Sequence, residues 1–145
     1  EALFFAEQKA RSIENQYPNS LILSADTLVE CEGEKLGKPL DEKDTTKILQ
    51  KLSGKTHLIH TGVVFLNTAT HEIKKHLEKV AVSFRTLSPQ EIQHYISTHE
   101  SMGKAGAYAI QGKARAFITQ IEGEEEAAIG LPLRILKEWL TKVPQ

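Results

Sequence analysis

The chain has 145 residues, of which 40% are hydrophobic and 26% are charged, so it can bury a core beneath a hydrated surface. Its formal net charge of −1 excludes a global field that would attract a nucleic acid polymer or an anionic lipid surface. There is no apolar run long enough to cross a bilayer, and the single cysteine excludes an internal disulfide, so we predict a cytoplasmic protein with neither a membrane nor a nucleic acid polymer as partner.

The first predicted element is a helix that starts at once. The first residue is Glu1 and not Met, and apolar residues recur at helical spacing in the segment that follows. The helix is expected to end near Tyr17-Pro18-Asn19, because a proline disfavours helical geometry in the residue before it. Since this helix has no cap and no preceding strand, we expect that the chain begins inside its domain and lacks an N-terminal segment.

An apolar run that begins at Leu21 predicts a buried strand that stops at Asp26. Ligands of open α/β sheets lie outside the carboxyl ends of strands, so a rigid element would deliver this carboxylate to a site. Further on, Gly37-Lys38-Pro39 predicts a turn that presents a cation. An acid and a lysine held in this way suit a phosphate ester and its metal ion. The alternative interpretation is a turn cap and a solvated loop.

The next elements are a hairpin and a capped helix. Two short strands, Leu28 to Cys31 and Lys35 to Leu36, flank a predicted tight turn at Glu32-Gly33-Glu34. Asp41 predicts the N-cap of the helix that follows, and Gly54 predicts its end.

Two segments rich in strand-forming residues, 57–67 and 73–87, then predict an antiparallel hairpin. In the second segment Val80, Val82 and Phe84 alternate with smaller or polar residues, which indicates one buried face.

The C-terminal third mixes helices and strands. Ser88-Pro89-Gln90-Glu91 predicts a helix start with a capping box, and Pro132 predicts the start of the last helix. Between them, Phe117 to Ile121 predicts a short strand and Glu122 to Glu126 an exposed acidic turn. The last helix is expected to bury Leu136, Trp139, Leu140 and Val143. This order of elements predicts a single domain of the α/β or α+β class.

Lysines in glycine-containing loops are the candidates for a phosphate site. Lys38 and Lys104 each lie in such a loop, and Lys9 is a third candidate. The chain has neither a Walker-type loop nor a Rossmann fingerprint, which disfavours both of those classes. The six histidines form no metal motif, because His57 and His60 lie three apart on a predicted strand and point to opposite faces.

Seven short motifs match one family in order along the chain. They are Ala25-Asp26-Thr27, Leu36-Gly37-Lys38-Pro39, Leu52-Ser53-Gly54, Thr61-Gly62-Val63, Lys104-Ala105-Gly106-Ala107-Tyr108, Ile110-Gln111-Gly112 and Gly130-Leu131-Pro132-Leu133. The ordered set covers nearly the whole chain. It resembles the Maf family of nucleoside triphosphate pyrophosphatases, known also for septum formation inhibition.

The resemblance implies an α/β fold, with a mixed elongated sheet, flanking helices and a central cleft, similar to that of inosine triphosphate pyrophosphatases. Residues 1–145 would form one Maf-like domain that is truncated at its N-terminus. The implied reaction is hydrolysis of dTTP, UTP or modified pyrimidine nucleotides to the monophosphate and pyrophosphate. The implied cofactor is magnesium or manganese, with unknown ligands, and the expected partners are the nucleoside triphosphate and a second copy in a homodimer.

The resemblance also implies roles for individual residues. Asp26 matches the family's proton acceptor, and a carboxylate can take the proton of a water that attacks the α-phosphorus. The matching lysines contact phosphate, where they would offset the charge on the leaving oxygens. Thr27 and Gln111 match positions linked to base choice, and an amide can both donate to and accept from a pyrimidine edge. The implied substrate-binding residues are Lys9, Thr27, Lys38, Lys104 and Gln111.

Two departures from the family pattern support an alternative. The chain has no Ser-x-Arg-Arg segment, and Gly123-Glu124-Glu125-Glu126-Ala127 replaces the usual Gly-Ser-Tyr-Ser-Asn. Acidic side chains would repel a triphosphate if they faced the cleft. The alternative is a catalytically impaired Maf-like domain that binds a nucleotide or a protein in cell-division control. A related purine triphosphate pyrophosphatase is a third interpretation.

Overall fold

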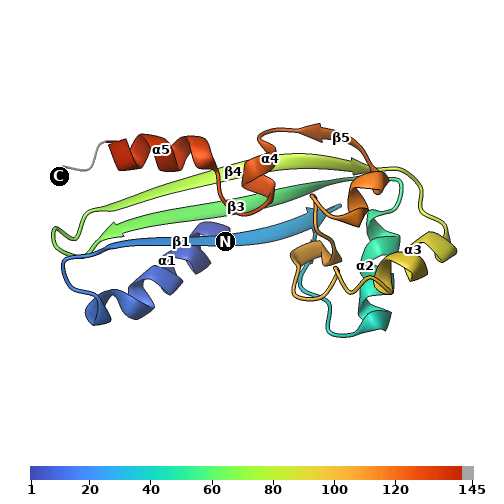
Figure 1. Ribbon diagram of the computed structural model, residues 1–145, viewed down its shortest axis with the longest axis horizontal. Coiled ribbons are helices and arrows are strands. Elements are labelled where there is room, and N and C mark those ends of the chain that lie inside the picture. Colours follow the sequence, from blue (N-terminus) through green and yellow to red (C-terminus); the bar gives the residue numbers. More distant parts are fainter. Residues whose placement is uncertain (142–145) are drawn as a thin grey trace. The chain divides into compact units, whose positions relative to one another are not determined.

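The computed structural model describes residues 1–141, which contain a five-stranded sheet of order β2-β1-β3-β4-β5 (Figure 1). The strands are β1 (Leu21–Cys31), β2 (Glu34–Leu36), β3 (Thr56–Asn67), β4 (Ile73–Phe84) and β5 (Ile118–Glu122). The α-helices are α1 (Ala2–Ile13), α2 (Glu42–Leu52), α3 (Pro89–Ile96), α4 (Glu125–Ala128) and α5 (Leu133–Thr141). Single 3₁₀ turns are formed by Glu14–Gln16, Ala105–Ala107 and Lys113–Phe117. The predicted α/β class with flanking helices is confirmed.

The chain divides into two compact units. Unit 1 comprises Glu1–Thr27, His60–Lys79 and the described residues from Glu126 onward. Unit 2 comprises Leu28–Ile59 and Val80–Glu125. Strands β1, β3 and β4 contribute residues to both units, and the expectation of one domain stays a prediction.

Strand β1 differs from its prediction. It runs without a break from Leu21 to Cys31, so Asp26 lies in the middle of an 11-residue strand rather than at its end. The sheet is antiparallel at β1–β2 and β4–β5, and Figure 1 shows β1 and β4 running against β3. The rule that places ligands at carboxyl ends applies to parallel sheets, so it does not locate a site here. The acid interrupts the apolar pattern without ending the strand, because backbone pairing continues past it.

Local signals placed most other boundaries correctly. Glu32 and Gly33 both have positive φ, 51° and 80°, as a type I′ hairpin turn requires. The Asp41 carboxylate accepts from the Asp44 backbone N–H at 2.8 Å and caps α2. Gly54, with φ 68°, follows the end of that helix.

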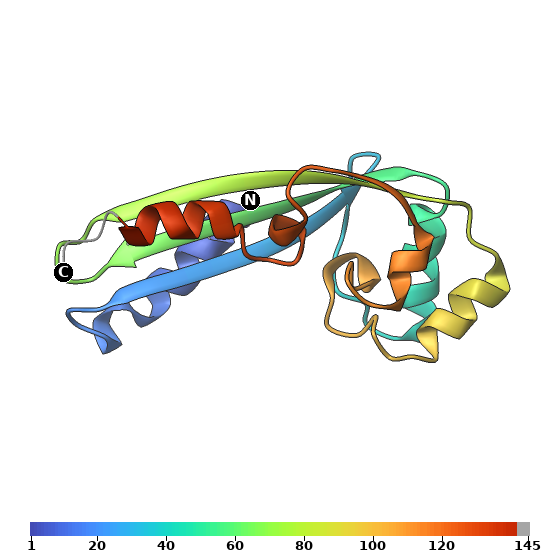
Figure 2. The ribbon, with the colours of Figure 1, turned by 45° about the horizontal axis from the view of Figure 1, so that its top comes forward.

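In unit 1, alternate residues of β3 pack against helices on opposite faces of the sheet. Val64 and Leu66 join Ala6 and Ala10 of α1 in one buried cluster. On the other face the Phe65 ring lies 6.0 Å from the Trp139 ring of α5, measured between centroids. Figure 2 accordingly shows α1 behind the strands and α5 in front of them. Because successive side chains of a strand point to opposite faces of the sheet, Val64 and Leu66 contact α1 whereas Phe65 contacts α5.

At Gly62 the backbone of α1 lies close against β3. An added Cβ would lie 2.5 Å from the Leu3 backbone nitrogen and 2.6 Å from the Ala2 carbonyl carbon. Backbone atoms cannot swing away as a side chain can, so Gly62→Ala should destabilise the fold by about 1–3 kcal/mol. Urea denaturation measures this loss. Gly37→Ala is the control, because its Cβ would meet nothing within 4 Å, and equal stability losses in the two variants would contradict the close-approach explanation.

The last helix buries fewer of its predicted residues than expected. Ile135 and Leu136 are buried, and Trp139 is half-buried. The prediction for Leu140 is wrong, since this side chain is 58% exposed. Val143 lies outside the described residues. At 100° per residue, Leu140 lies at the edge of the helix face formed by Ile135, Leu136 and Trp139, so its side chain is turned toward solvent.

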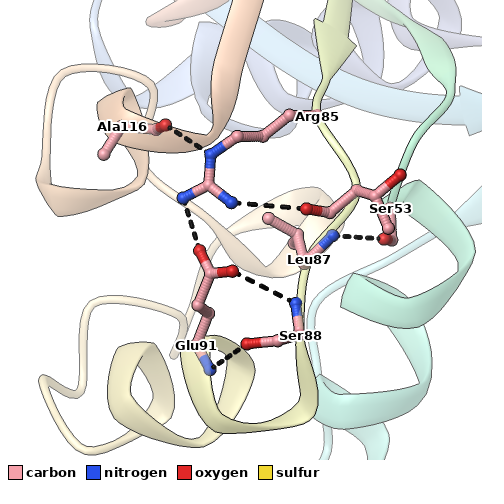
Figure 3. A network of polar contacts seen from close by, with 7 residues as sticks. Ser53, Arg85, Leu87, Ser88, Glu91 and Ala116 are labelled. Atoms are coloured by element: carbon pink, nitrogen blue, oxygen red, sulfur yellow. Dashed lines mark hydrogen bonds and ion pairs between the residues drawn. The ribbon is translucent and has the colours of Figure 1, made fainter.

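In unit 2, an ion pair fixes the start of α3 to the end of β4 (Figure 3). The Glu91 carboxylate accepts from the Ser88 backbone N–H at 3.3 Å, and the Ser88 hydroxyl accepts from the Glu91 N–H at 3.1 Å, so the predicted capping box is confirmed. The Arg85 guanidinium pairs with Glu91 and donates to the Ala116 carbonyl at 3.2 Å. This guanidinium, with the Ser88 contacts, lowers the pKa of Glu91 to about 2.

No helix within residues 1–141 combines the length and the apolar character that a bilayer-spanning segment needs.

Candidate active site

Asp26 forms an ion pair with Lys9, one of the three lysines predicted for the phosphate site. The Lys9 amine lies 2.8 Å from Asp26 Oδ1 and 3.2 Å from the Ala25 carbonyl oxygen. The pair joins α1 to the middle of β1, within unit 1. The Asp26 side chain is 19% exposed and that of Lys9 is 58% exposed, so water reaches both. Within residues 1–141 the second carboxylate oxygen, Oδ2, has no hydrogen-bond partner, which leaves it able to accept a proton.

Thr27 forms a second polar contact in unit 1, between two threonine hydroxyls. Its hydroxyl lies 3.4 Å from the Thr61 hydroxyl, which is buried and bonds to the Ala127 carbonyl at 2.6 Å. The Thr61 hydroxyl has one proton and gives it to Ala127, so Thr27 is the donor in the contact between the two threonines. The Thr27 oxygen keeps free lone pairs and can accept from a ligand N–H.

Asp26 and Thr27 are adjacent in the chain but face opposite sides of the sheet. Asp26 contacts Lys9 of α1, whereas Thr27 contacts Thr61, which is bonded to α4. The alternation of side chains along a strand imposes this separation. The sequence motif alone did not show that the side chains of the two predicted site residues lie on opposite faces of the sheet.

The two predicted phosphate lysines of unit 2 lie in loops that are bonded to each other. Gly106 N–H donates to the Gly37 carbonyl at 3.1 Å, so the loop of Lys104 rests on the loop of Lys38. Both side chains are exposed, and within residues 1–141 neither amine has an ion pair or hydrogen bond. Two unpaired ammonium groups on adjacent loops suit a polyphosphate.

Gln111 is exposed in the same unit, directly after the buried Ile110. Its amide has no protein partner within residues 1–141. The chain turn after it is fixed by Glu100, whose carboxylate oxygens accept from the Lys113 N–H at 2.9 and 3.2 Å. Both the donor and the acceptor of the amide are thus available to a ligand.

The acidic residues that depart from the family pattern are partly neutralised. Glu125 begins α4 and forms an ion pair with Arg115 of the same unit. Glu124 and Glu125 are half-buried, and Glu126 is exposed. At least one of the three charges is therefore paired with a cation of the chain.

The described residues offer a divalent cation one carboxylate of the predicted site, that of Asp26. In the part of the chain that the structure describes, no group of three or more His, Cys, Asp or Glu side chains is placed to hold a metal ion. Magnesium is commonly held by one or two carboxylates together with substrate phosphates and water. Asp26 has an unpartnered oxygen and can supply one such carboxylate.

One hollow within unit 2 has a volume of about 480 Å³. It is lined by Gln90, Glu91, His94, Tyr95, Thr98, Lys113, Ala116 and Phe117. Its walls come from α3 and from the turn at residues 113–117. No predicted site residue is among them, so the hollow is not the predicted phosphate site.

Comparison with known proteins places the chain in a family. The family described as "Maf-like protein" matches residues 1–143. The chain belongs to the Maf family. A relative from Acholeplasma laidlawii named dTTP/UTP pyrophosphatase is 45% identical over 135 residues, which are 93% of this chain and 70% of that relative.

Other organisms also have Maf relatives with the same name. A dTTP/UTP pyrophosphatase of Bacillus pumilus is 43% identical over 132 residues, or 90% of this chain and 68% of the relative. One from Pyrococcus abyssi is 39% identical over 137 residues, or 94% of this chain and 72% of the relative. The family predicted from the ordered motifs is confirmed.

Sequence reasoning gave no site role to three residues whose contacts involve Thr27 or the segment that follows Lys104. The Thr61 hydroxyl contacts the Thr27 hydroxyl. The only feature of the sequence that could have indicated this residue was its place in the Thr61-Gly62-Val63 motif. His57 and Tyr108 form a buried pair beneath the Lys104 loop, joined at 2.7 Å. They lie 51 positions apart, so no local pattern connects them.

Proposed function

We propose that this Maf chain hydrolyses dTTP or UTP to the monophosphate and pyrophosphate. The observation that carries the proposal is its match, over nine tenths of its length or more, to relatives named dTTP/UTP pyrophosphatase. Asp26, the lysine-bearing loops and Gln111 all lie within the residues matched to the Maf family.

Asp26 serves as the proton acceptor. Its unpartnered Oδ2 takes a proton from water as the water oxygen bonds to the α-phosphorus. The bond from that phosphorus to the bridging oxygen breaks, and pyrophosphate leaves with the bonding electrons. Lys9, held on Oδ1 at 2.8 Å, fixes the orientation of the carboxylate. Lys38 and Lys104 offset the negative charge of the phosphates, which increases at the leaving group as the bond breaks.

We propose magnesium or manganese as the cofactor. When bound, the ion would neutralise phosphate charge and polarise the P–O bond under attack. Asp26 is the residue that would contribute to holding it, together with substrate oxygens. Thr27 and Gln111 contribute to base choice, Thr27 as an acceptor and the Gln111 amide as both donor and acceptor. The cytoplasmic location, the homodimer and the role in septum formation stay predictions.

The test is pyrophosphate release from a panel of dTTP, UTP, dCTP, dATP and ITP, with and without each metal. The expected result is metal-dependent release that is fastest with dTTP and UTP. Fastest release from ITP would instead support the purine enzyme. Calorimetry that showed nucleotide binding, with no release from any member of the panel, would refute the proposal and favour the catalytically impaired domain.

A further inference from the structure

The loop that carries Lys104 has an unusual backbone in unit 2. Gly106 and Ala107 are consecutive residues with φ of 74° and 66°, in the left-handed region. An alanine rarely adopts this conformation, which costs free energy and persists only where the surroundings hold it. Ala107 is fully buried, and a Cβ on Gly106 would lie 3.0 Å from the Val29 side chain.

Two buried aromatic side chains hold the segment that follows. Tyr108 is 5% exposed, and its hydroxyl lies 2.7 Å from Nε2 of His57, which is 1% exposed. The Tyr108 ring packs edge to face against the Phe84 ring, with centroids 4.9 Å apart. The next residue, Ala109, donates its N–H to the Tyr95 hydroxyl at 3.1 Å. These contacts fix the loop on its inner side.

The outer side of the same loop touches the loop of Lys38. The Gly106 N–H donates to the Gly37 carbonyl, which joins the two loops. Within the Lys104 loop, the Ala107 N–H donates to the Lys104 carbonyl at 3.0 Å and closes the turn. The strained turn thus sets where Lys104 stands relative to Lys38.

We propose that His57 and Tyr108 are positioning residues, whose hydrogen bond holds the Lys104 loop against the Lys38 loop and presents both amines to one polyphosphate. The role deepens the proposed function and rests on it for the identity of the substrate. Neither side chain touches the substrate, because both are buried. The binding of inorganic tripolyphosphate reports on the two lysines without any turnover.

The test is calorimetry of tripolyphosphate binding to the whole chain. Tyr108→Phe removes the hydroxyl and keeps the ring, and the dissociation constant should rise roughly threefold to tenfold. Tyr17→Phe is the matched control, because the Tyr17 side chain is 53% exposed and its hydroxyl has no partner within residues 1–141. This control should bind as the unchanged chain does.

A second pair of variants tests the same hydrogen bond from the His57 side. His57→Gln keeps an amide near the Nε2 position that can either donate to or accept from the Tyr108 hydroxyl, so it should preserve affinity. His57→Leu removes the hydrogen-bonding group and should weaken binding as much as Tyr108→Phe does. Circular dichroism checks that each variant is folded. If Tyr108→Phe does not fold, the His57 pair decides the test.

A double variant separates positioning from general loosening of the fold. In a Lys104→Ala background, Tyr108→Phe should cause no further loss of tripolyphosphate affinity, because its effect acts through Lys104. An equal loss in both backgrounds, or unchanged affinity in Tyr108→Phe or His57→Leu, would overturn the proposal. An unchanged chain that binds tripolyphosphate but hydrolyses no nucleotide would refute only the proposed function.

Discussion

Asp26→Asn should lower kcat for pyrophosphate release by roughly 10²- to 10⁴-fold, the range typical of a lost general base. The amide has nearly the same shape as the carboxylate, but it cannot take the proton of the attacking water. Steady-state release of pyrophosphate from dTTP and UTP measures the loss. We expect KM to change less than kcat, because the lysines proposed to contact the phosphates remain in place.

The same substitution should leave the fold nearly unchanged. The Lys9–Asp26 pair is open to water, with side chains 58% and 19% exposed, and exposed ion pairs contribute at most about 1 kcal/mol. Asp44→Asn is the control, since it makes the same chemical change in the first turn of α2. Equal activity of Asp26→Asn and Asp44→Asn would show that Asp26 is not the proton acceptor.

Acid should destabilise the fold through His57. Burial lowers the pKa of this imidazole from 6.5 to about 4 in the folded chain. Between these two values the unfolded chain binds a proton that the folded chain does not, so stability falls as the pH falls from 6.5 to about 4. A shift of this size corresponds to about 3 kcal/mol at most, and the loss should level off below the folded pKa.

Urea denaturation at about pH 7 and about pH 4.5 measures this dependence. His57→Gln keeps a polar group beside Tyr108 but cannot titrate, so its stability should depend less on pH than that of the unchanged chain. His94→Gln is the matched control, because it makes the same chemical change at an exposed position of α3. If His57→Gln and the unchanged chain lost the same stability in acid, the explanation would be wrong.

Elements whose signals lie within a few residues could be predicted from the sequence. The capping box of Ser88 and Glu91 satisfies backbone groups of its own first turn, so its motif suffices. The turn at Glu32-Gly33 and the alternation of the buried Val80 and Val82 with Ala81 are local in the same sense. In each case the residue types determine the conformation through neighbours in the chain.

The two wrong predictions concerned the end of a strand and the width of the buried face of a helix. The end of the first strand at Asp26 was inferred from lost hydrophobicity, but the ladder continues because strand pairing involves the backbone. The burial of Leu140 was inferred from helical spacing, but the packing partner decides which face of a helix is buried, and Leu140 lies at the edge of that face. Both depend on elements elsewhere in the chain.

For the site, the sequence by itself determined the family and the chemical types available, namely an acid, lysines in glycine-containing loops and an amide. Only the tertiary structure decided that Lys9 pairs with Asp26, that Thr27 faces the other side of the sheet, and that a buried histidine holds Tyr108. The physical reason is sequence separation. These contacts join residues 17, 34 and 51 positions apart, and such pairs meet only after strands and helices have packed.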